Sequence, residues 1–302
     1  MGPLDRSSWK ILVTGITSIH GWPIYNKLLG VFSTERIFGI RPPKVRFPQE
    51  KNIVSGCVTD TSLFSEIKRT FAPTHVVHAA GVCDLDMCED DPLKAYAINT
   101  EGTRNIVSFF GDTSHIVYVS ADLVFSGHRP PAGGYTEEHA PDPISVVGKT
   151  YLAAEKEMAK AARGSIVRIG LPMGDSVQGE KGAIDFIEGR FKRKLPMTLF
   201  HDEWRSCIHC EELADILVEL LLVEERGLFH LGGPKPVSLY EIGQSIIERG
   251  AYDHRLLKKL SRHEEENGPP RVGNVHLNSG KIERVLGRKI GEWPSRRTMK
   301  SN

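Results

Sequence analysis

The alternation of short apolar runs with longer helical stretches restricts the fold of this sequence more than any other feature. The short runs are rich in Val and Ile, which suits strands, and helical patterns separate them. Such alternation predicts parallel strands joined by right-handed helical crossovers. The expected strands are Lys10–Thr14, Arg36–Ile40, His75–His78, His115–Ser120 and Ser165–Arg168, and the expected helices are Pro23–Leu29, Thr61–Thr70, Pro92–Phe110 and Ser145–Ala162.

The composition changes after about Arg168, where loops rich in Gly, Pro and charged residues alternate with shorter regular pieces. We therefore predict an α/β protein, with a doubly wound parallel sheet and a smaller α/β lobe that lies over the carboxyl ends of the strands. The predicted division assigns residues 1–168 and about 203–226 to the sheet domain. Residues 169–202 and 227–302 are assigned to the lobe.

Charge and hydropathy argue against several classes of partner. The 302 residues include 39 Lys plus Arg and 38 Asp plus Glu, a formal net charge of +1 that offers no excess for binding a polyanion. The most apolar stretch, Ile216–Val223, falls short of the ~20 residues of a membrane-spanning helix. No secretory signal is recognisable at the start of the sequence. The five cysteines are an odd number scattered along the chain, which does not suggest a disulfide framework; they are Cys57, Cys83, Cys88, Cys207 and Cys210. We therefore expect a cytoplasmic protein with a small-molecule ligand and without nucleic-acid or membrane partners.

A glycine-containing loop follows the first predicted strand and opens a helix. Gly15 and Gly21 have the spacing of a dinucleotide loop, in which the free N–H groups of a helix N-terminus bind a pyrophosphate. Ser18 stands where the middle glycine is expected, and its Cβ would push toward the pyrophosphate. The pattern predicts a Rossmann-type cofactor site; its candidate residues in this loop are Gly15, Thr17, Ser18, Ile19 and Gly21.

A basic residue ends the second predicted strand, where NAD-binding proteins carry an acid that accepts the ribose 2′-OH. Arg41 stands at this position, and Lys44 and Arg46 follow closely. These side chains favour the 2′-phosphate of NADP, while NAD remains possible and a solvated basic loop is the alternative interpretation.

Ordered motifs along nearly the whole chain resemble a known family. They are Val77–Gly81, Ala97–Asn105, Ser120–Gly127, Gly148–Lys156, Asp202–Ser206, Phe229–Pro234 and Asn274–Lys281. The sequence is similar to extended short-chain dehydrogenases/reductases, in particular the dTDP-4-dehydrorhamnose reductase group, which includes the regulatory β subunit of methionine adenosyltransferase. The resemblance implies NAD(P)H-dependent reduction of a nucleotide-linked 4-keto-6-deoxysugar, or use of the scaffold as a binding subunit. It also implies further cofactor contacts at Cys57, Val58, Ala79, Ala80, Gly81 and Asn99, with Cys57 replacing the usual Asp.

The family's catalytic groups are replaced in this chain. By the resemblance, a Ser or Thr, a Tyr and a Lys are expected where Ala121, Val147 and Tyr151 stand. Loss of the acid–base group alone costs about 10²–10⁴ in rate. The candidate substitutes are Tyr151 itself, Ser120 and Asp122; Lys149 is also near, but its side chain would point ~200° away from position 151 on a helix.

A second candidate region lies beneath the predicted lobe. Arg205 and His209 are interpreted as contacts for an anionic substrate, with structural salt bridges as the alternative. Cys207, His209 and Cys210 superficially suggest zinc, but neighbouring strand residues point to opposite faces, so we expect buried thiols and no metal.

We therefore predict an NADP-binding, reductase-like protein that has lost standard ketoreductase chemistry and works as a binding or regulatory protein. The alternatives are a reductase that uses Tyr151, and a redox-neutral isomerase, cyclase or lyase in the same pocket. A protein partner and a homodimer both remain possible.

Overall fold

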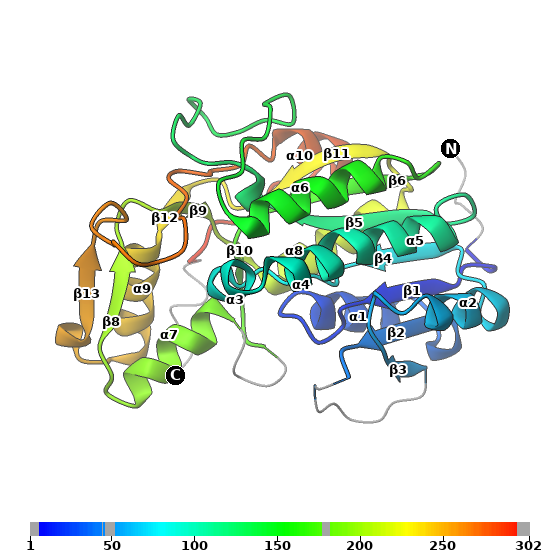
Figure 1. Ribbon diagram of the computed structural model, residues 1–302, viewed down its shortest axis with the longest axis horizontal. Helices are drawn as coiled ribbons and strands as arrows, with labels where there is room; N and C mark the ends of the chain where they lie inside the picture. Colours follow the sequence, from blue (N-terminus) through cyan, green and yellow to red (C-terminus); the bar gives the residue numbers. More distant parts are fainter. Residues whose placement is uncertain (1–5, 44, 46–51, 177–181, 295–302) are drawn as a thin grey trace.

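The computed structural model describes residues 6–43, 45, 52–176 and 182–294. Its centre is a seven-stranded sheet in the order β11-β6-β5-β4-β1-β2-β3, with every neighbouring pair parallel (Figure 1). The predicted fold class is therefore confirmed. The strands are β1 (Ile11–Thr14), β2 (Ile37–Arg41), β3 (Ile53–Ser55), β4 (His75–His78), β5 (His115–Ala121), β6 (Gly164–Ile169) and β11 (Gly227–Leu231).

Helices cover both faces of the sheet and bury two separate apolar cores. One core joins the sheet to α1 (Gly21–Leu29), α8 (Cys210–Leu222) and α10 (Gly280–Leu286). The other core joins it to α2 (Thr61–Thr70), α5 (Gly102–Phe110) and α6 (Val146–Met158). Two short helices, α3 (Leu85–Asp90) and α4 (Pro92–Tyr96), lead into α5 through a π-helical turn at Ala97–Glu101. The single helix expected over Pro92–Phe110 is therefore interrupted by a wider turn.

The lobe lies beside one end of the sheet and has its own apolar core. It contains α7 (Ala183–Lys192) and α9 (Leu239–Gly250), together with small two-stranded pairings of β8 (Met197–Phe200) with β13 (Leu257–Leu260) and of β9 (Trp204–Ser206) with β12 (Pro236–Ser238). A further pair, β7 (Pro172–Met173) with β10 (Ile208–His209), lies near α8. Three 3₁₀ turns complete the described elements, at Thr34–Arg36, Asp122–Val124 and His254–Leu256.

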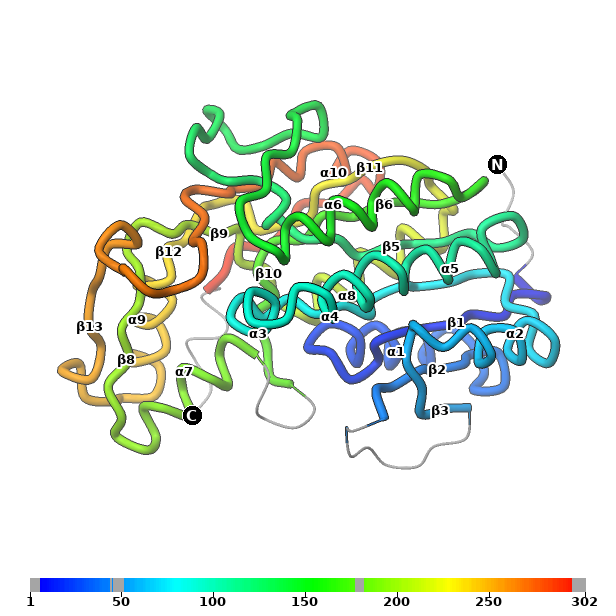
Figure 2. The backbone as a smooth tube through the Cα atoms, viewed as in Figure 1, coloured from blue at the N-terminus to red at the C-terminus, as the bar shows by residue number. Residues whose placement is uncertain are grey.

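Residues 227–302 were expected wholly in the lobe and residues 203–226 in the sheet domain, and the structure corrects both expectations. Strand β11 and helix α10 join the sheet core, whereas β9 pairs with β12 of the lobe. After α7, β8 and β9 of the lobe and helix α8, the chain returns to the sheet, where Gly227–Leu231 pairs with β6, and it then forms β12, α9 and β13 of the lobe (Figure 2). Phe229 and Leu231 are fully buried in the sheet core, and Ile282 of α10 joins them. The short strand escaped prediction because Gly and Pro residues surround it, which locally resembles a loop.

Helix α6 carries two of the substituted catalytic positions, and its first turn is firmly held. The Ser145 hydroxyl accepts a hydrogen bond from the Gly148 N–H at 3.1 Å, and a Cβ on Gly148 would collide with the carbonyl oxygen of Leu123. This cap sets the register that turns Val147 and Tyr151 inward and leaves Lys149 exposed.

No helix in the described part of the chain is long and apolar enough to cross a membrane.

Candidate functional site

The strand order reverses between β1 and β4, and we use the term crevice for the edge of the sheet at the carboxyl ends of these two strands. Ligands of doubly wound sheets bind at such a switch point. Gly15 has a φ of +70°, and a Cβ on it would lie 2.6 Å from the carbonyl oxygen of Ala79 and 2.7 Å from the Cα of Ala80. The loop after β1 therefore packs directly on the loop after β4, which only glycine permits.

Ser18 turns its hydroxyl toward the start of α1. Its Oγ accepts a hydrogen bond from the Gly21 N–H at 2.9 Å. Among the described residues, no partner engages the main-chain N–H groups of Thr17, Ile19 or His20. Free N–H groups at the positive end of a helix suit a pyrophosphate, so the loop fits a dinucleotide despite the missing middle glycine.

A buried histidine, His78, connects β1 with α5 beside this end of the sheet. His78 lies between Thr14, whose Oγ1 is 2.7 Å from Nδ1, and Thr103, whose Oγ1 is 3.0 Å from Nε2. Thr14 Oγ1 accepts from the Ala80 N–H, while Thr103 donates to the Asn99 carbonyl. This network assigns a neutral ring protonated on Nε2. Burial lowers the pKa of His78 to about 3, in agreement with that assignment.

Arg41 braces the loop that follows β2. Its Nη1 donates to the carbonyl oxygens of Pro42 at 3.3 Å and Val45 at 3.0 Å. The guanidinium is therefore engaged with its own loop in this structure. Lys44 and Arg46, which strengthened the expectation of NADP, lie outside the described residues.

Cys57 and Val58 follow β3 on the same side of the crevice. The Cys57 sulfur accepts a hydrogen bond from the Thr59 hydroxyl at 3.1 Å, and Cys57 is half-buried. The Val58 carbonyl accepts a hydrogen bond from Asn105 Nδ2 at 3.0 Å, and the side chain of Val58 packs against Gly102 of α5. A thiol cannot replace the two acceptor oxygens of the expected carboxylate.

Asn99 fixes the loop that follows β4. Its side chain accepts from the Val82 N–H at 2.7 Å and donates to the Val82 carbonyl at 2.9 Å. The same amide donates to Thr150 Oγ1 of α6 at 2.9 Å. Asn99 therefore shapes the crevice by clamping Val82 and α6, and the π-helical turn places it there. Sequence reasoning missed Val82 and Thr150 because their roles depend on this contact between distant segments.

The substituted catalytic positions come together beside that loop. Val147 is fully buried, and Ala121 is half-buried at the end of β5. Tyr151 is 8% exposed, and its hydroxyl lies so close to Gly81 that a Cβ there would collide with it. Burial raises the pKa of Tyr151 well above its usual value, so the phenol is neutral. It lacks the positive charge of the lysine that the resemblance implied.

Ser120, a candidate catalytic residue, belongs to a buried structural network. Its hydroxyl donates to Glu155 Oε1 at 2.6 Å, and the carboxylate of Glu155 accepts two bonds from Arg168, at 2.9 and 2.7 Å. All three residues are at most 6% exposed. Arg168 also stacks over Phe125 and approaches His230. The proton of the Ser120 hydroxyl is therefore donated to Glu155 in the core and is not directed at a ligand in this structure.

The structure pairs Asp122 with Arg205. Arg205 Nε donates to Oδ2 at 2.8 Å and Nη2 donates to Oδ1 at 2.5 Å, while Asp122 is fully buried. Burial works to lower the pKa of Arg205, but the Asp122 carboxylate outweighs it and raises the pKa, which keeps the guanidinium charged. This geometry is the structural salt bridge considered as the alternative for Arg205, and it joins the sheet domain to the lobe.

His209 occupies a different position from Arg205 and has no described interaction with it. It precedes α8 as its N-cap residue and is half-buried. Its Nε2 is enclosed and has no hydrogen-bond partner in the described part of the chain. Burial lowers the pKa of His209, which keeps the ring neutral at pH 7.

Cys207 and Cys210 are buried, as expected for core thiols. Within the described ranges, no three His, Cys, Asp or Glu side chains are arranged to hold a metal. Cys83 differs from them because it is exposed, directly after the clamped Val82. The sequence offered no signal for this exposure, since Cys83 and Cys88 both stand in the same acidic segment.

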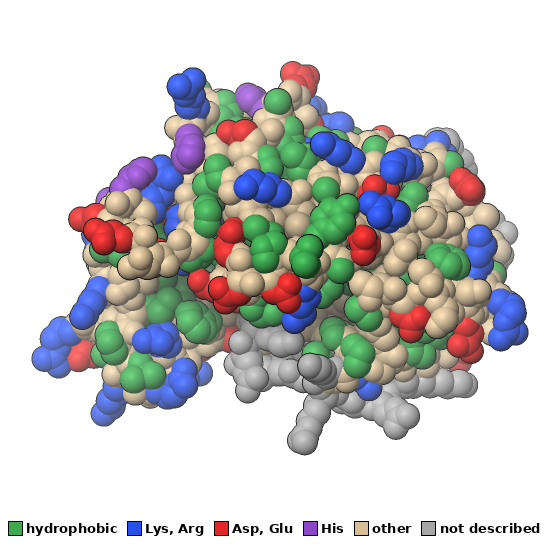
Figure 3. All heavy atoms as spheres, viewed as in Figure 1, with side chains coloured by type: hydrophobic (Ala, Val, Ile, Leu, Met, Phe, Trp, Pro, Cys, Tyr) green, Lys and Arg blue, Asp and Glu red, His purple; other side chains and the backbone are tan. Residues whose placement is uncertain are grey.

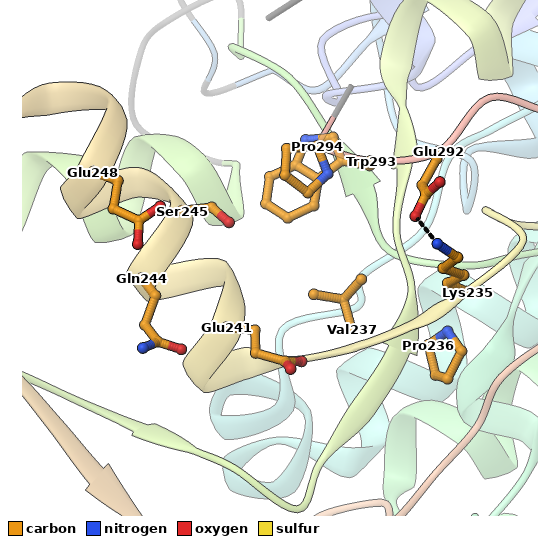
Figure 4. A pocket seen from close by; sticks show the side chains of 10 residues that line it. All are labelled: Lys235, Pro236, Val237, Glu241, Gln244, Ser245, Glu248, Glu292, Trp293 and Pro294. Atoms are coloured by element: carbon orange, nitrogen blue, oxygen red, sulfur yellow. Dashed lines mark ion pairs between the residues drawn. The ribbon is translucent and has the colours of Figure 1, made fainter. Parts of the chain in front are cut away.

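Two surface hollows lie away from the crevice residues. One, of about 330 Å³, lies between β12, α9 and the segment around Trp293, whose ring forms one wall (Figure 4). Glu241, Glu248 and Glu292 make it acidic, and Lys235 pairs with Glu292 at 2.6 Å. The other, of about 410 Å³, is bounded by α10 and the segment Thr136–Glu138. Neither hollow contains a candidate catalytic or cofactor residue.

The parallel sheet and the glycine loop after β1, which lies at the switch point of the strand order, define a Rossmann-type α/β protein. Similarity to known proteins specifies the family within this class. The chain belongs to the family described as RmlD substrate binding domain, which matches residues 9–299.

A subunit of an adenosyltransferase and reductases are both among the proteins that the chain is similar to. The chain is 25% identical over 305 residues to methionine adenosyltransferase 2 subunit beta of Rattus norvegicus, an alignment that covers 95% of this chain and 88% of the relative. A crystal structure of a hypothetical dTDP-4-dehydrorhamnose reductase from Sulfolobus tokodaii is 26% identical, with a TM-score of 0.77 and coverage of 93% and 96%. The dTDP-4-dehydrorhamnose reductase of Bacillus anthracis in complex with NADP is 20% identical, with a TM-score of 0.79 and coverage of 96% and 97%.

Proposed function

We propose that this protein binds an NADP-type dinucleotide in the β1/β4 crevice and acts as a binding or regulatory protein without standard ketone reduction. The observation that carries the proposal is the side-chain chemistry at the substituted positions. Val147 cannot donate a proton, and Ala121 cannot orient a carbonyl. Tyr151 is buried and neutral, so it cannot supply the charge that lowers a phenol's pKa.

The proposed ligand-binding residues remain suitable for a dinucleotide. The N–H groups of Thr17, Ile19 and His20 would hold the pyrophosphate. The loops at Cys57–Val58 and Ala79–Gly81 would flank its two halves, and Asn99 would keep the second loop in place. NADPH, when bound, supplies a hydride, but this chain offers no group at the family's acid position to protonate the resulting alkoxide.

Binding and turnover must be measured on the same sample. We expect saturable quenching or enhancement of NADPH fluorescence, and no enzyme-like consumption of NADPH at 340 nm with a dTDP-4-keto-6-deoxysugar. Gly15→Ala is the matched negative control, because its Cβ would meet the Ala79 carbonyl and separate the two loops. Turnover at family-like rates would contradict the proposal, and absence of saturable binding would contradict its cofactor part.

A reductase with altered chemistry is the second candidate function. The Tyr151 hydroxyl favours it, because this group lies at the crevice loop beside Gly81 and could donate a proton from an unusual position. If it does so, Tyr151→Phe abolishes turnover and leaves NADPH affinity within about threefold of wild type. Redox-neutral chemistry would instead convert a nucleotide-sugar without consuming NADPH, which product analysis by mass spectrometry detects.

The α3–α4 surface supports a protein partner. Met87, Leu93 and Tyr96 are 50%, 84% and 40% exposed, and hydrophobic, acidic and basic side chains are interspersed over these helices and α6 (Figure 3). Exposed apolar side chains with a charged surround are typical of interaction surfaces. Sedimentation velocity of wild type and Leu93→Glu would test self-association here: a wild-type dimer that dissociates in the variant would identify the partner as a second copy.

A further inference from the structure

The hollow of about 330 Å³ in the lobe has two walls of different chemistry (Figure 4). Its polar wall is one face of α9, where four side chains follow the spacing i, i+3, i+4 and i+7 that places residues on one side of a helix. They are Glu241, Gln244, Ser245 and Glu248. Another wall is apolar and is formed by Trp293 and Pro294.

The α9 wall carries hydrogen-bonding groups that the described residues leave unused. The side chains of Gln244, Ser245 and Glu248 form no hydrogen bond or ion pair with any residue that the structure describes. Glu241 uses one carboxylate oxygen, Oε2, which accepts from the N–H and the hydroxyl of Ser238 at 2.8 and 2.9 Å. Because an α-helix rises 1.5 Å per residue, the two glutamates of this wall stand about 10 Å apart along the helix axis.

Acidic groups outnumber basic groups around the hollow. Lys235 is the only cation among the residues that line it, and its Nζ lies 2.6 Å from Glu292 Oε1. These two side chains are 68% and 50% exposed, so their ion pair is weak and a competing cation can replace Lys235. Three carboxylates against one ammonium group leave the hollow negative, which favours a cationic ligand.

The Trp293 indole gives an independent indication of a ligand. The residue is only 6% exposed, yet its Nε1 has no hydrogen-bond partner among the described residues and is not one of the enclosed polar atoms. The N–H group is therefore accessible from the hollow that the ring lines. An indole N–H can only donate, so its partner must be an acceptor. A metal ion and a fully protonated polyamine offer no acceptor, whereas the main-chain carbonyl of a peptide does.

We propose that this hollow binds a basic peptide segment of a protein partner. Alternate side chains of an extended segment lie on the same side, so two lysines or arginines at such positions would approach Glu241 and Glu248. Their apolar stems would pack on Pro294 while the charged ends stay in water. A carbonyl of the segment would accept the hydrogen bond from Trp293. The proposal is independent of the dinucleotide, because no candidate catalytic or cofactor residue lines the hollow.

Titrations of the full chain with three probes test the proposal. The probes are the peptide Ac-Gly-Lys-Ala-Lys-Gly-NH2, the same peptide with glutamate in place of both lysines, and spermidine. We expect calorimetry to show that the lysine peptide binds at least tenfold more tightly than either of the others. In ¹⁵N NMR spectra the four tryptophans give separate indole signals, and the signal missing from Trp293→Phe identifies Trp293. The lysine peptide should shift this signal saturably.

Substitutions in the hollow should change the affinity for the lysine peptide in opposite directions. Glu248→Gln should weaken binding by about 2–5-fold, the effect of one exposed ion pair. Lys235→Ala should strengthen it by a similar factor, because Glu292 becomes available. Trp293→Phe should weaken it by about 2–10-fold through the lost hydrogen bond. Glu66→Gln is the matched control, because Glu66 of α2 is also an exposed helical glutamate whose carboxylate has no described partner.

Equal binding of the two peptides, or a Trp293 signal that the lysine peptide leaves in place, would overturn the proposal. Spermidine that binds as tightly as the lysine peptide would overturn it as well, since the hollow would then accept a small polycation. Should Trp293→Phe not fold, the opposite effects expected of Glu248→Gln and Lys235→Ala decide. Failure of wild type to bind NADPH would contradict the proposed function and leave this inference unaffected.

Discussion

The two ends of the crevice have changed in different ways. At the phosphate loop, Ser18 replaces a glycine, yet its hydroxyl caps Gly21 and leaves neighbouring N–H groups available. At the other end, Ala121 and Val147 stand where the family resemblance implies polar catalytic groups, and the neighbouring Ser120 and Asp122 are bonded to Glu155 and Arg205 in the core. A binding loop tolerates substitution because its donors belong to the main chain, whereas acid–base chemistry depends on side chains that have no backbone substitute.

The largest effect is expected from acid, which should lower the free energy of unfolding through buried histidines near both ends. Burial lowers the pKa of His78, under the phosphate loop, to about 3, and that of His230, beside Arg168, to about 4. The unfolded chain therefore binds more protons between these values and about pH 6.5, so stability falls as the pH falls through this range. Each histidine contributes up to about 1.4 kcal/mol per pH unit. Urea unfolding at pH 7.5, 6.0 and 5.0 measures the decline.

His78→Gln and His230→Gln, compared in the same series, identify which end is responsible. Each variant should have a shallower pH dependence than wild type. A pH-independent wild-type stability over this range would contradict the neutral assignment of both rings.

Removal of Asp122 should have the next largest effect, because it leaves the buried Arg205 guanidinium without its two hydrogen bonds and with only the Glu203 carboxylate, at 3.8 Å, beside it. We expect Asp122→Ala to lower the free energy of unfolding by about 3–5 kcal/mol. The double variant Asp122→Ala with Arg205→Met should recover part of this loss, since no charge then remains unpaired. Chemical denaturation measures both. A loss below about 1 kcal/mol in the single variant would indicate that solvent reaches Arg205 and that the catalytic end is open.

Gly15→Ala tests the packing of the phosphate loop. An alanine at position 15 would be strained at the φ of +70°, and its Cβ would lie 2.6 Å from the carbonyl oxygen of Ala79. We expect a loss of about 1–3 kcal/mol in stability together with loss of dinucleotide binding. Gly189→Ala in α7 is the control, because a Cβ there meets nothing within 4 Å, and it should stabilise the helix by about 0.5–1 kcal/mol. Unchanged dinucleotide affinity in Gly15→Ala would exclude this loop as the site.

The smallest effect is expected from Ser18. Ser18→Ala removes the hydrogen bond to the Gly21 N–H and should cost about 1 kcal/mol of stability, with NADPH affinity within about twofold of wild type. Ser18→Gly distinguishes the cap from a steric obstacle, because it removes the Cβ as well. If Ser18→Gly binds NADPH more than tenfold more tightly than wild type, Ser18 obstructs the pyrophosphate and the phosphate loop has been impaired like the catalytic end.

Patterns local in the chain predicted most of the fold. Apolar runs identified five of the seven strands of the sheet, namely β1, β2, β4, β5 and β6, because burial on both faces makes such strands continuously apolar. Two strands of the sheet were missed, β3 and β11. Strand β3 has only three residues, and the five residues of β11 stand between loop-like segments; each becomes a strand through its pairing, with β2 and with β6. The π-helical turn was not predicted either, because nothing local in the sequence marks it, and the contacts of Asn99 with Val82 and Thr150 join segments distant in the chain.

The candidate site was predictable where it depends on residue type and unpredictable where it depends on partners. The substitutions at Ala121, Val147 and Tyr151 could be recognised directly in the sequence. The use of Ser120 by Glu155 and of Arg205 by Asp122 could not, because each pair joins segments 35 or 83 residues apart. Ser120 and Arg205, which were expected to serve catalysis or substrate binding, therefore stabilise the fold instead.

The return of the chain to the sheet as β11 has a consequence for synthesis on the ribosome. Strand β6 presents an open edge from the moment that Gly164–Ile169 emerges until Gly227–Leu231 follows and pairs with it. During that interval the nascent sheet has an unprotected strand beside an incomplete lobe, a situation that invites pairing with other chains. Nascent chains halted before β11 should therefore depend on chaperones more strongly than chains halted after it.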